Sequence, residues 1–216
     1  MEKSQQSIVR IFKDSPQSRR YDIELSTGRV ISIHEDVLVA FGLHKGMTIE
    51  TDQWQHWLEE DERVKIRQTA YRYLSYRPRT SAEVTQYLCK HEWQEGLVEQ
   101  VVEELSSSRY IDDRAYAVEW VRQRQQNKGI GMKRLRQELI QKGVALHWIE
   151  EALLHIDEDQ ERQQAMTIAE RRYLRICHER WDKIERRIGS YLIRRGYSTQ
   201  IVYPILSELR NRHRGG

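Results

Sequence analysis

The sequence Leu139-Ile140-Gln141-Lys142-Gly143-Val144 recurs 53 residues later as Leu192-Ile193-Arg194-Arg195-Gly196-Tyr197, and its counterpart 51 residues earlier is Leu88-Cys89-Lys90-His91-Glu92-Trp93. Apolar residues follow each copy at positions i, i+3, i+4 and i+7, which place them on one face of a helix. These residues are Val98, Val101, Val102 and Leu105; Ile149, Ala152, Leu153 and Ile156; and Val202, Ile205, Leu206 and Leu209. Self-similarity at a nearly fixed period is the signature of a repeat architecture.

Each copy marks a unit of three short helices. Gly143 and Gly196 follow the second helix of their units, where a left-handed glycine lets the chain turn sharply. Glu92 takes that place in the first unit, so we expect a different turn there. Pro204 would cost about 3 kcal/mol beyond the first turn of a helix, so we expect the last helix to begin late or to kink. One such unit cannot bury its apolar face alone, whereas three in series can.

The first 60 residues follow a different pattern. Three short runs rich in β-branched and aromatic residues predict strands, namely Ile8–Phe12, Tyr21–Leu25 and Arg29–Ile33, with Ser26-Thr27-Gly28 as a tight hairpin connection. A short helix over residues 37–41 and a return strand over 47–50 complete the module. The helical period begins at Asp61, with the first helix expected over 62–76. Thr80, with Glu83 three residues later, predicts a capping box at the next helix.

The predicted fold class is mainly α: an elongated array of three tandem three-helix repeats, preceded by a small β-rich N-terminal module. We expect the module to cover residues 1–60 and the repeats to cover 61–111, 112–157 and 158–216. The composition agrees, because 38% apolar and 32% charged residues favour thin layers over one deep core.

Two adjacent carboxylates, Asp112 and Asp113, stand where the first repeat joins the second. Neighbouring residues on a helix point about 100° apart, so these side chains do not converge on one metal or substrate. We interpret Asp112 as a helix N-cap, with Ile111 packing on Tyr116. Asp182 is predicted to cap a helix of the third repeat in the same way.

The net charge of +3 conceals two opposed halves. Residues 1–113 hold 15 basic and 20 acidic side chains, whereas residues 114–216 hold 21 and 13. A basic half is typical of a protein that meets a polyanion, and arginine pairs bidentately with phosphate. The residues expected to bind nucleic acid or an acidic filament surface are Arg122, Arg124, Lys128, Lys133, Arg134, Arg136, Lys142, Arg171, Arg172, Arg175, Arg186, Arg187, Arg194 and Arg195.

Several other classes of function lack their sequence motifs. The chain has no HExxH or zinc-spaced cluster, no phosphate-binding glycine loop and no nucleophile motif. We therefore expect no metal, no cofactor and no enzymatic activity. No stretch is long and apolar enough to span a membrane. Cys89 and Cys177 form no CxxC pair, and we interpret them as buried or half-buried thiols of a cytoplasmic protein.

Two stretches of the second repeat closely resemble the RecX regulatory family. They are Tyr110-Ile111-Asp112-Asp113-Arg114-Ala115-Tyr116-Ala117-Val118-Glu119-Trp120-Val121 and Gly131-Met132-Lys133-Arg134-Leu135-Arg136-Gln137-Glu138-Leu139-Ile140-Gln141-Lys142-Gly143-Val144. The array from about residue 62 to 212 is similar to the tandem three-helix repeats of that family. The β-rich head resembles the N-terminal extension of its longer members.

The resemblance implies a non-enzymatic modulator of the RecA recombinase, in DNA repair by homologous recombination and in the SOS response. Family members are understood to lodge in the helical groove of the RecA–DNA filament and to dampen ATP hydrolysis, strand exchange and LexA cleavage. The implied partners are the RecA filament and single- or double-stranded DNA, and we expect a monomer. A free-standing DNA-binding regulator of helix-turn-helix type is the alternative, motivated by the short helices with glycine turns.

Overall fold

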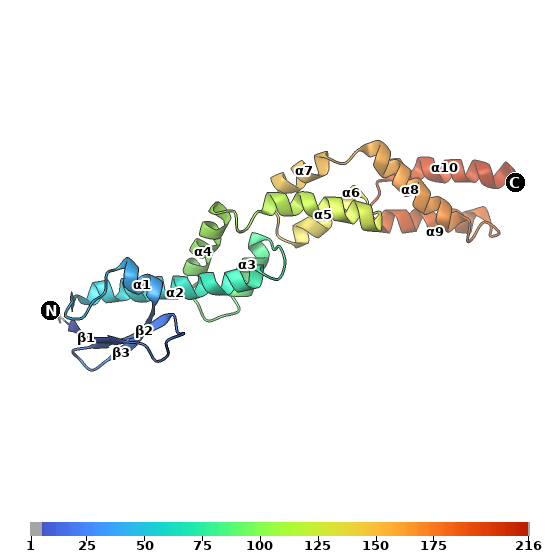
Figure 1. Cartoon of the computed structure of the whole chain (residues 1–216). Coiled ribbons are helices and arrows are strands. Elements are labelled where there is room, and N and C mark those ends of the chain that lie inside the picture. Colours follow the sequence, from blue (N-terminus) through green and yellow to red (C-terminus); the bar gives the residue numbers. More distant parts are fainter. Residues whose placement is uncertain (1–5, 216) are drawn as a thin grey trace. The chain divides into compact units, whose positions relative to one another are not determined.

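A computed structural model describes residues 6–215, and of Thr51, Asp52, Asn127 and Lys128 it describes the backbone alone. The chain divides into two compact units. The first unit consists of the chain up to Arg77 together with the segment Val84–Leu105. The second unit contains Pro78–Glu83 and the chain from Ser106 onward (Figure 1). Among the described residues, no helix is both long and apolar enough to cross a membrane.

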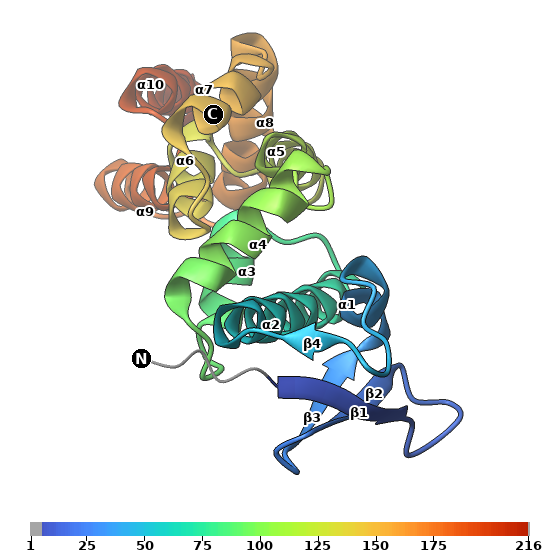
Figure 2. The same cartoon turned by 90° about the vertical axis from the view of Figure 1, so that its left-hand side faces the viewer.

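The N-terminal part of the first unit is a four-stranded antiparallel sheet, as the strand pattern predicted. The strands are β1 (Gln6–Phe12), β2 (Arg20–Leu25), β3 (Val30–His34) and β4 (Thr48–Ile49), in the order β3-β2-β1-β4. The helices α1 (Glu35–Ala40) and α2 (Thr51–Leu74) cover the same face of this sheet (Figure 2). Alternate strand residues such as Ile8, Ile23 and Ile33 point into the buried layer between them.

Helix α2 begins at Thr51, so the prediction that the first helix would start at residue 62 is wrong. The additional turns follow a capping box between Glu50 and Gln53. Trp57 and Val64, which lie seven residues apart on one helix face, are buried against the sheet. The residues between them are mostly polar, so the sequence shows no helical periodicity of apolar residues in this segment.

Asp61 of α2 is a buried carboxylate in the first unit, only 1% exposed. Its two oxygens accept from the guanidinium of Arg20 at 2.8 Å, from the backbone N–H of His34 at 2.7 Å and from Lys65 Nζ at 2.8 Å. The carboxylate therefore ties the sheet to the helix that covers it.

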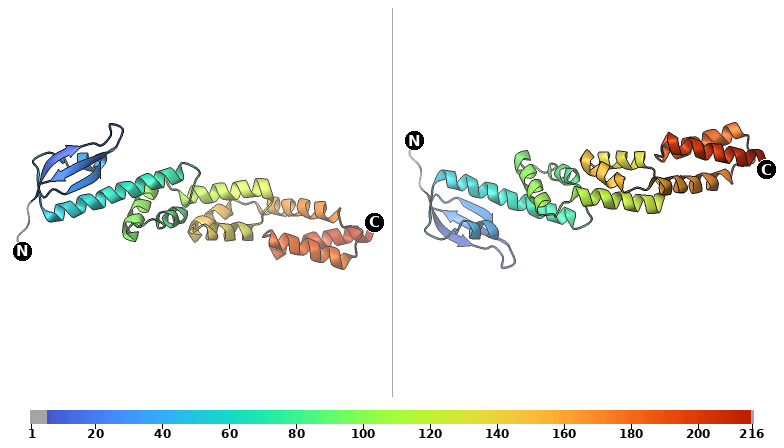
Figure 3. Two further views of the ribbon diagram at one scale, coloured as in Figure 1. Left: turned by 90° about the horizontal axis from the view of Figure 1, so that it is seen from below. Right: turned by 90° about the horizontal axis from the view of Figure 1, so that it is seen from above.

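The remaining helices follow in consecutive triplets, which confirms the three-repeat architecture. The first repeat is α2 with α3 (Ser81–Leu88) and α4 (Glu95–Ser107). The second is α5 (Asp113–Lys128), α6 (Met132–Gln141) and α7 (Leu146–Leu154). The third is α8 (Glu158–Tyr173), α9 (Trp181–Arg194) and α10 (Thr199–Gly215), with α10 beside α8 and α9 (Figure 3). All twelve residues of the repeated apolar columns are buried.

The turns after the second helices also follow the sequence. Gly143 and Gly196 adopt φ angles of 75° and 91°, in the left-handed region that glycine favours. The first repeat turns differently, as Glu92 predicted: residues 89–94 link α3 to α4 without a left-handed residue. Helix α10 begins five residues before Pro204 and continues through it, so of the two expected alternatives, a late start or a kink, the late start is wrong.

Two junctions inside the second unit are built alike. At one of them, the turn after α6 packs on the N-terminus of α3, where Thr80 Oγ1 donates to the carbonyl of Lys142 at 2.6 Å. A Cβ on Gly143 would overlap that of Ala82. At the other, the turn after α9 packs on the N-terminus of α6, and the Lys133 N–H donates to the carbonyl of Gly196 at 3.1 Å. In both junctions, the N-terminus of the second helix of one repeat packs against the turn that follows the second helix of the next repeat.

Helix caps show where the sequence interpretation held and where it failed. Asp112 caps α5 by accepting from the Ala115 N–H at 2.8 Å, as predicted. Asp182 does not cap α9, because it lies within the first turn and Arg180 is the N-cap. The counterpart of Asp112 in the third repeat is Asp157, which caps α8. Cys89 and Cys177 are exposed, contrary to the expected burial.

Candidate nucleic-acid interface

The structure separates the predicted basic residues into two groups. Among the described side chains, six of the fourteen already pair with carboxylates of the second unit. The pairs are Arg122–Glu119, Arg124–Glu138, Arg134–Glu138, Arg136–Glu150, Lys142–Glu83 and Arg187–Glu179. Such residues must give up a partner before they can neutralise a phosphate.

Several residues of these pairs make further contacts within the fold. Glu138 also accepts from the indole N–H of Trp120 at 3.1 Å, and the cations of Arg124 and Lys142 lie 4.3 and 5.2 Å from the centre of that ring. Hydrogen bonds from the Arg122 guanidinium and from Gln123 lower the pKa of Glu119 to about 2, so this carboxylate is ionised at neutral pH. Arg122, Arg124, Arg134 and Arg136 of α5 and α6 are therefore engaged within the fold.

A second group has no such partners. Lys133, Arg171, Arg172, Arg175, Arg186 and Arg194 make no ion pair with any carboxylate that the structure describes. Five of them are exposed and Arg172 is half-buried. The side chain of Lys128, the last residue of α5, lies outside the described part of the chain. The unpaired charge therefore concentrates in the third repeat.

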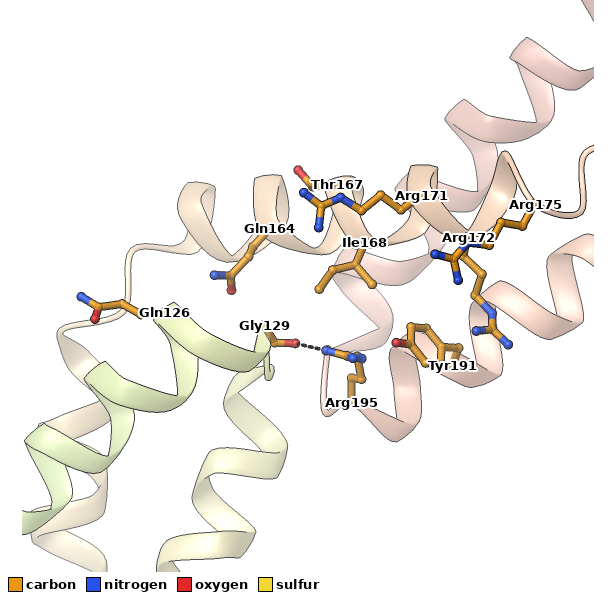
Figure 4. A pocket seen from close by; sticks show the side chains of 10 residues that line it. All are labelled: Gln126, Gly129, Gln164, Thr167, Ile168, Arg171, Arg172, Arg175, Tyr191 and Arg195. Atoms are coloured by element: carbon orange, nitrogen blue, oxygen red, sulfur yellow. Dashed lines mark hydrogen bonds between the residues drawn. The ribbon is translucent and has the colours of Figure 1, made fainter.

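Four arginines line one cavity of about 530 Å³ in the second unit (Figure 4). Arg171 and Arg172 stand in the last turn of α8, Arg175 follows in the turn after it, and Arg195 is the C-cap of α9. The complete lining is Gln126, Gly129, Gln164, Thr167, Ile168, Arg171, Arg172, Arg175, Tyr191 and Arg195. Arg186, Arg187 and Arg194, which were predicted with them, do not line it.

Gly129 closes the cavity on the side of the second repeat. It ends α5 in a left-handed conformation with φ of 53°, and a Cβ there would lie 2.6 Å from Ile168 Cδ1 of α8. Its carbonyl accepts from Arg195 Nη1 at 3.1 Å, the hydrogen bond drawn in Figure 4. Arg195 is therefore a half-buried bridge between the two repeats and not part of a solvated surface.

The electrostatics of the cavity favour an anion. The C-terminal ends of α5, α8 and α9 all reach it, and each carries a partial charge of about −0.5, roughly −1.5 for the three. Four guanidinium groups outweigh that charge, and no carboxylate stands among the described lining residues. Guanidinium groups form bidentate hydrogen bonds with phosphate oxygens. The arrangement suits a ligand with several phosphates.

The number of basic residues in the sequence does not distinguish those that pair with carboxylates from those that do not. The partners of the first group were visible in part, because Glu119–Arg122 and Arg134–Glu138 have the i,i+3 and i,i+4 spacings of helix ion pairs. The polar and aromatic members of the cavity, such as Gln126, Gln164 and Tyr191, carry no sequence signal. They meet only because tertiary packing brings the end of α5 to α8 and α9.

Two family models match the chain. One, described as "RecX, second three-helix domain", covers residues 112–153, and the other, "RecX, first three-helix domain", covers residues 67–105. The chain is 31% identical over 205 residues to "Regulatory protein RecX" of Geobacillus sp. (strain WCH70), which covers 94% of this chain and 76% of the relative. It is also 31% identical over 206 residues to the protein of that name from Halalkalibacterium halodurans, with 94% and 77% covered.

Two solved structures are similar over most of their length. "Crystal structure of regulatory protein RecX" superposes with a TM-score of 0.81 and 27% sequence identity, covering 94% of this chain and 99% of that one. "Crystal structure of RecX from Lactobacillus salivarius" gives a TM-score of 0.65 at 27% identity, covering 70% and 98%.

Proposed function

This chain belongs to the RecX family of regulatory proteins, and from that membership we propose that it binds the RecA recombinase filament in the cytoplasm, contacts DNA and lowers RecA activity. The activities concerned are ATP hydrolysis, strand exchange and the coprotease activity toward LexA. The action is regulatory and not enzymatic, and the binding form is a monomer.

The observation that carries the proposal is the match over 94% of the chain, which includes the N-terminal module as well as the repeats. Repeats in series support a filament partner, because they present several helical surfaces along one chain. The cavity arginines and the unpaired arginines beside them support the DNA contact, since phosphate contacts supply most of the sequence-independent affinity for nucleic acid.

The ATPase rate of RecA on single-stranded DNA tests this function. Addition of the purified protein at a near-stoichiometric ratio to RecA is expected to lower that rate, because the protein occupies the active filament. Excess single-stranded DNA added afterwards is the control. An unchanged rate contradicts the proposal, as does full recovery with added DNA, which would mean that the protein only sequesters the strand.

The alternative of a helix-turn-helix regulator receives less support. Such a protein reads bases with side chains of one recognition helix in the major groove. In α6, the second helix of the second repeat, Arg134 and Arg136 are engaged by Glu138 and Glu150. A footprint on one duplex sequence in the absence of RecA would favour this alternative.

A further inference from the structure

We propose that the arginine cavity of the second unit is a discrete phosphoryl-binding site that fastens the third repeat to the second. Its ligand carries several phosphates, either along a nucleic-acid strand or in a free nucleoside triphosphate. The inference deepens the proposed DNA contact and rests on it only for the first of these sources. Binding at the cavity does not require RecA.

Three of the four arginines of the cavity, Arg171, Arg172 and Arg175, are poorly satisfied by the protein itself. Arg171 and Arg175 are exposed and make no ion pair among the described residues. The buried Nε of Arg172 has no hydrogen-bond partner in the described part of the chain. A buried donor without a partner is unfavourable, so a ligand oxygen that reaches the Nε of Arg172 relieves a cost already present in the fold.

The position of Tyr191 favours phosphates over bases. The guanidinium carbons of Arg172 and Arg195 lie over its ring, 4.3 and 4.9 Å from the centroid. Figure 4 shows the ring flanked by these two groups. A base needs a free aromatic face for stacking, and here both cations already use the ring. Recognition at this site is therefore independent of base sequence.

A ligand in the cavity touches two repeats at once. Gln126 and Gly129 come from the end of α5, whereas Arg172 and Arg195 come from α8 and α9. Two hydrogen bonds link the repeats directly at this edge, from Arg195 to the Gly129 carbonyl and from Gln164 to the Gln125 carbonyl. A polyphosphate that engages Arg172 and Arg195 forms charge-assisted bonds with the third repeat, and the side-chain amide of Gln126 donates to it from the second repeat. Binding thus stabilises the second unit against unfolding.

The test compares two double variants of equal charge, Arg171→Gln/Arg175→Gln in the cavity and Arg210→Gln/Arg214→Gln on α10. Arg210 and Arg214 are exposed and line no part of the cavity. The probes are a fluorescein-labelled oligothymidylate followed by anisotropy, and ATP and inorganic tripolyphosphate followed by the melting temperature. The protein is the full chain without RecA, and melting without ligand checks that both variants fold.

We expect the cavity variant to bind the strand at least about tenfold more weakly than the α10 variant. The slope of log K for the strand against log salt concentration should be smaller by about 1.4 in the cavity variant, because two phosphate contacts to a single strand are lost. Strand binding alone identifies a nucleic-acid backbone as the ligand, and a rise in melting temperature with ATP or tripolyphosphate that the cavity variant lacks identifies a free nucleotide. Equal losses in the two variants, or no binding of any probe, overturn the inference. Neither result bears on RecA inhibition.

Discussion

Gly196→Ala is expected to destabilise the second unit by about 2–5 kcal/mol, the sum of about 1–2 kcal/mol for a left-handed residue with a Cβ and about 1–3 kcal/mol for overpacking. Gly196 has a φ of 91°, and a Cβ there would overlap the backbone nitrogen and Cβ of Arg134 and lie 2.9 Å from its Cα. Those backbone atoms belong to α6 and cannot rotate away.

The expected loss reflects how the repeats are joined. The Gly131 N–H donates to the Arg195 carbonyl at 2.9 Å and the Lys133 N–H donates to the Gly196 carbonyl at 3.1 Å, so main chain meets main chain. Any side chain at Gly196 must separate these groups. Chemical denaturation followed by circular dichroism measures the effect.

Gly28→Ala is the matched control. Gly28 also has a left-handed φ of 80°, but no heavy atom lies within 4 Å of an added Cβ. The stability lost in Gly28→Ala should therefore be limited to the cost of the left-handed conformation, about 1–2 kcal/mol. A loss in Gly196→Ala no greater than that in Gly28→Ala would contradict the close junction between α9 and α6.

Asp61→Asn is expected to destabilise the N-terminal module by about 3–5 kcal/mol, because removal of one partner leaves the half-buried guanidinium of Arg20 uncompensated. Three donors converge on the Asp61 carboxylate, from Arg20, Lys65 and the His34 N–H. The amide of asparagine accepts through one oxygen only. Asp14→Asn, an exposed substitution in the same module, should stay within about 0.5 kcal/mol.

The same carboxylate predicts a dependence on pH. Burial alone would raise the pKa of Asp61, but the hydrogen bonds from Arg20, Lys65 and His34 outweigh it and hold the pKa below its ordinary value. A lowered pKa in the folded state stabilises the protein above the unfolded value of about 3.9, and that contribution is lost as the pH falls further. The difference in stability between wild type and Asp61→Asn should therefore shrink below about pH 4. A difference that stays constant would contradict this role.

The helical fold was largely predictable, because the apolar residues at corresponding positions of the three repeats are all buried. Leu88, Leu139 and Leu192 are fully buried, as their common positions required. The start of α2 was not predictable from period alone, since its first turns pack Trp57 on a sheet distant in the sequence. Asp157 was overlooked as a cap although Ile156-Asp157-Glu158 repeats Ile111-Asp112-Asp113.

The candidate site was predictable only as a region. Sequence placed basic residues in the second and third repeats, and the cavity contains four of them. Sequence did not show that Glu83 would reach Lys142, or that Glu150 would reach Arg136, because these pairs depend on tertiary packing. The half-buried position of Arg195 has the same origin, since Gly129 meets it only across a junction.

Electron microscopy of RecA–single-stranded DNA filaments assembled with this protein tests the central claim most directly. Regulation of the filament requires the protein to be bound to it while RecA is active. We expect extra density within the helical groove, in contact with successive RecA subunits and following the helical repeat of the filament. Filaments that cannot be distinguished from those formed without the protein, or density found only on bare DNA, would contradict it.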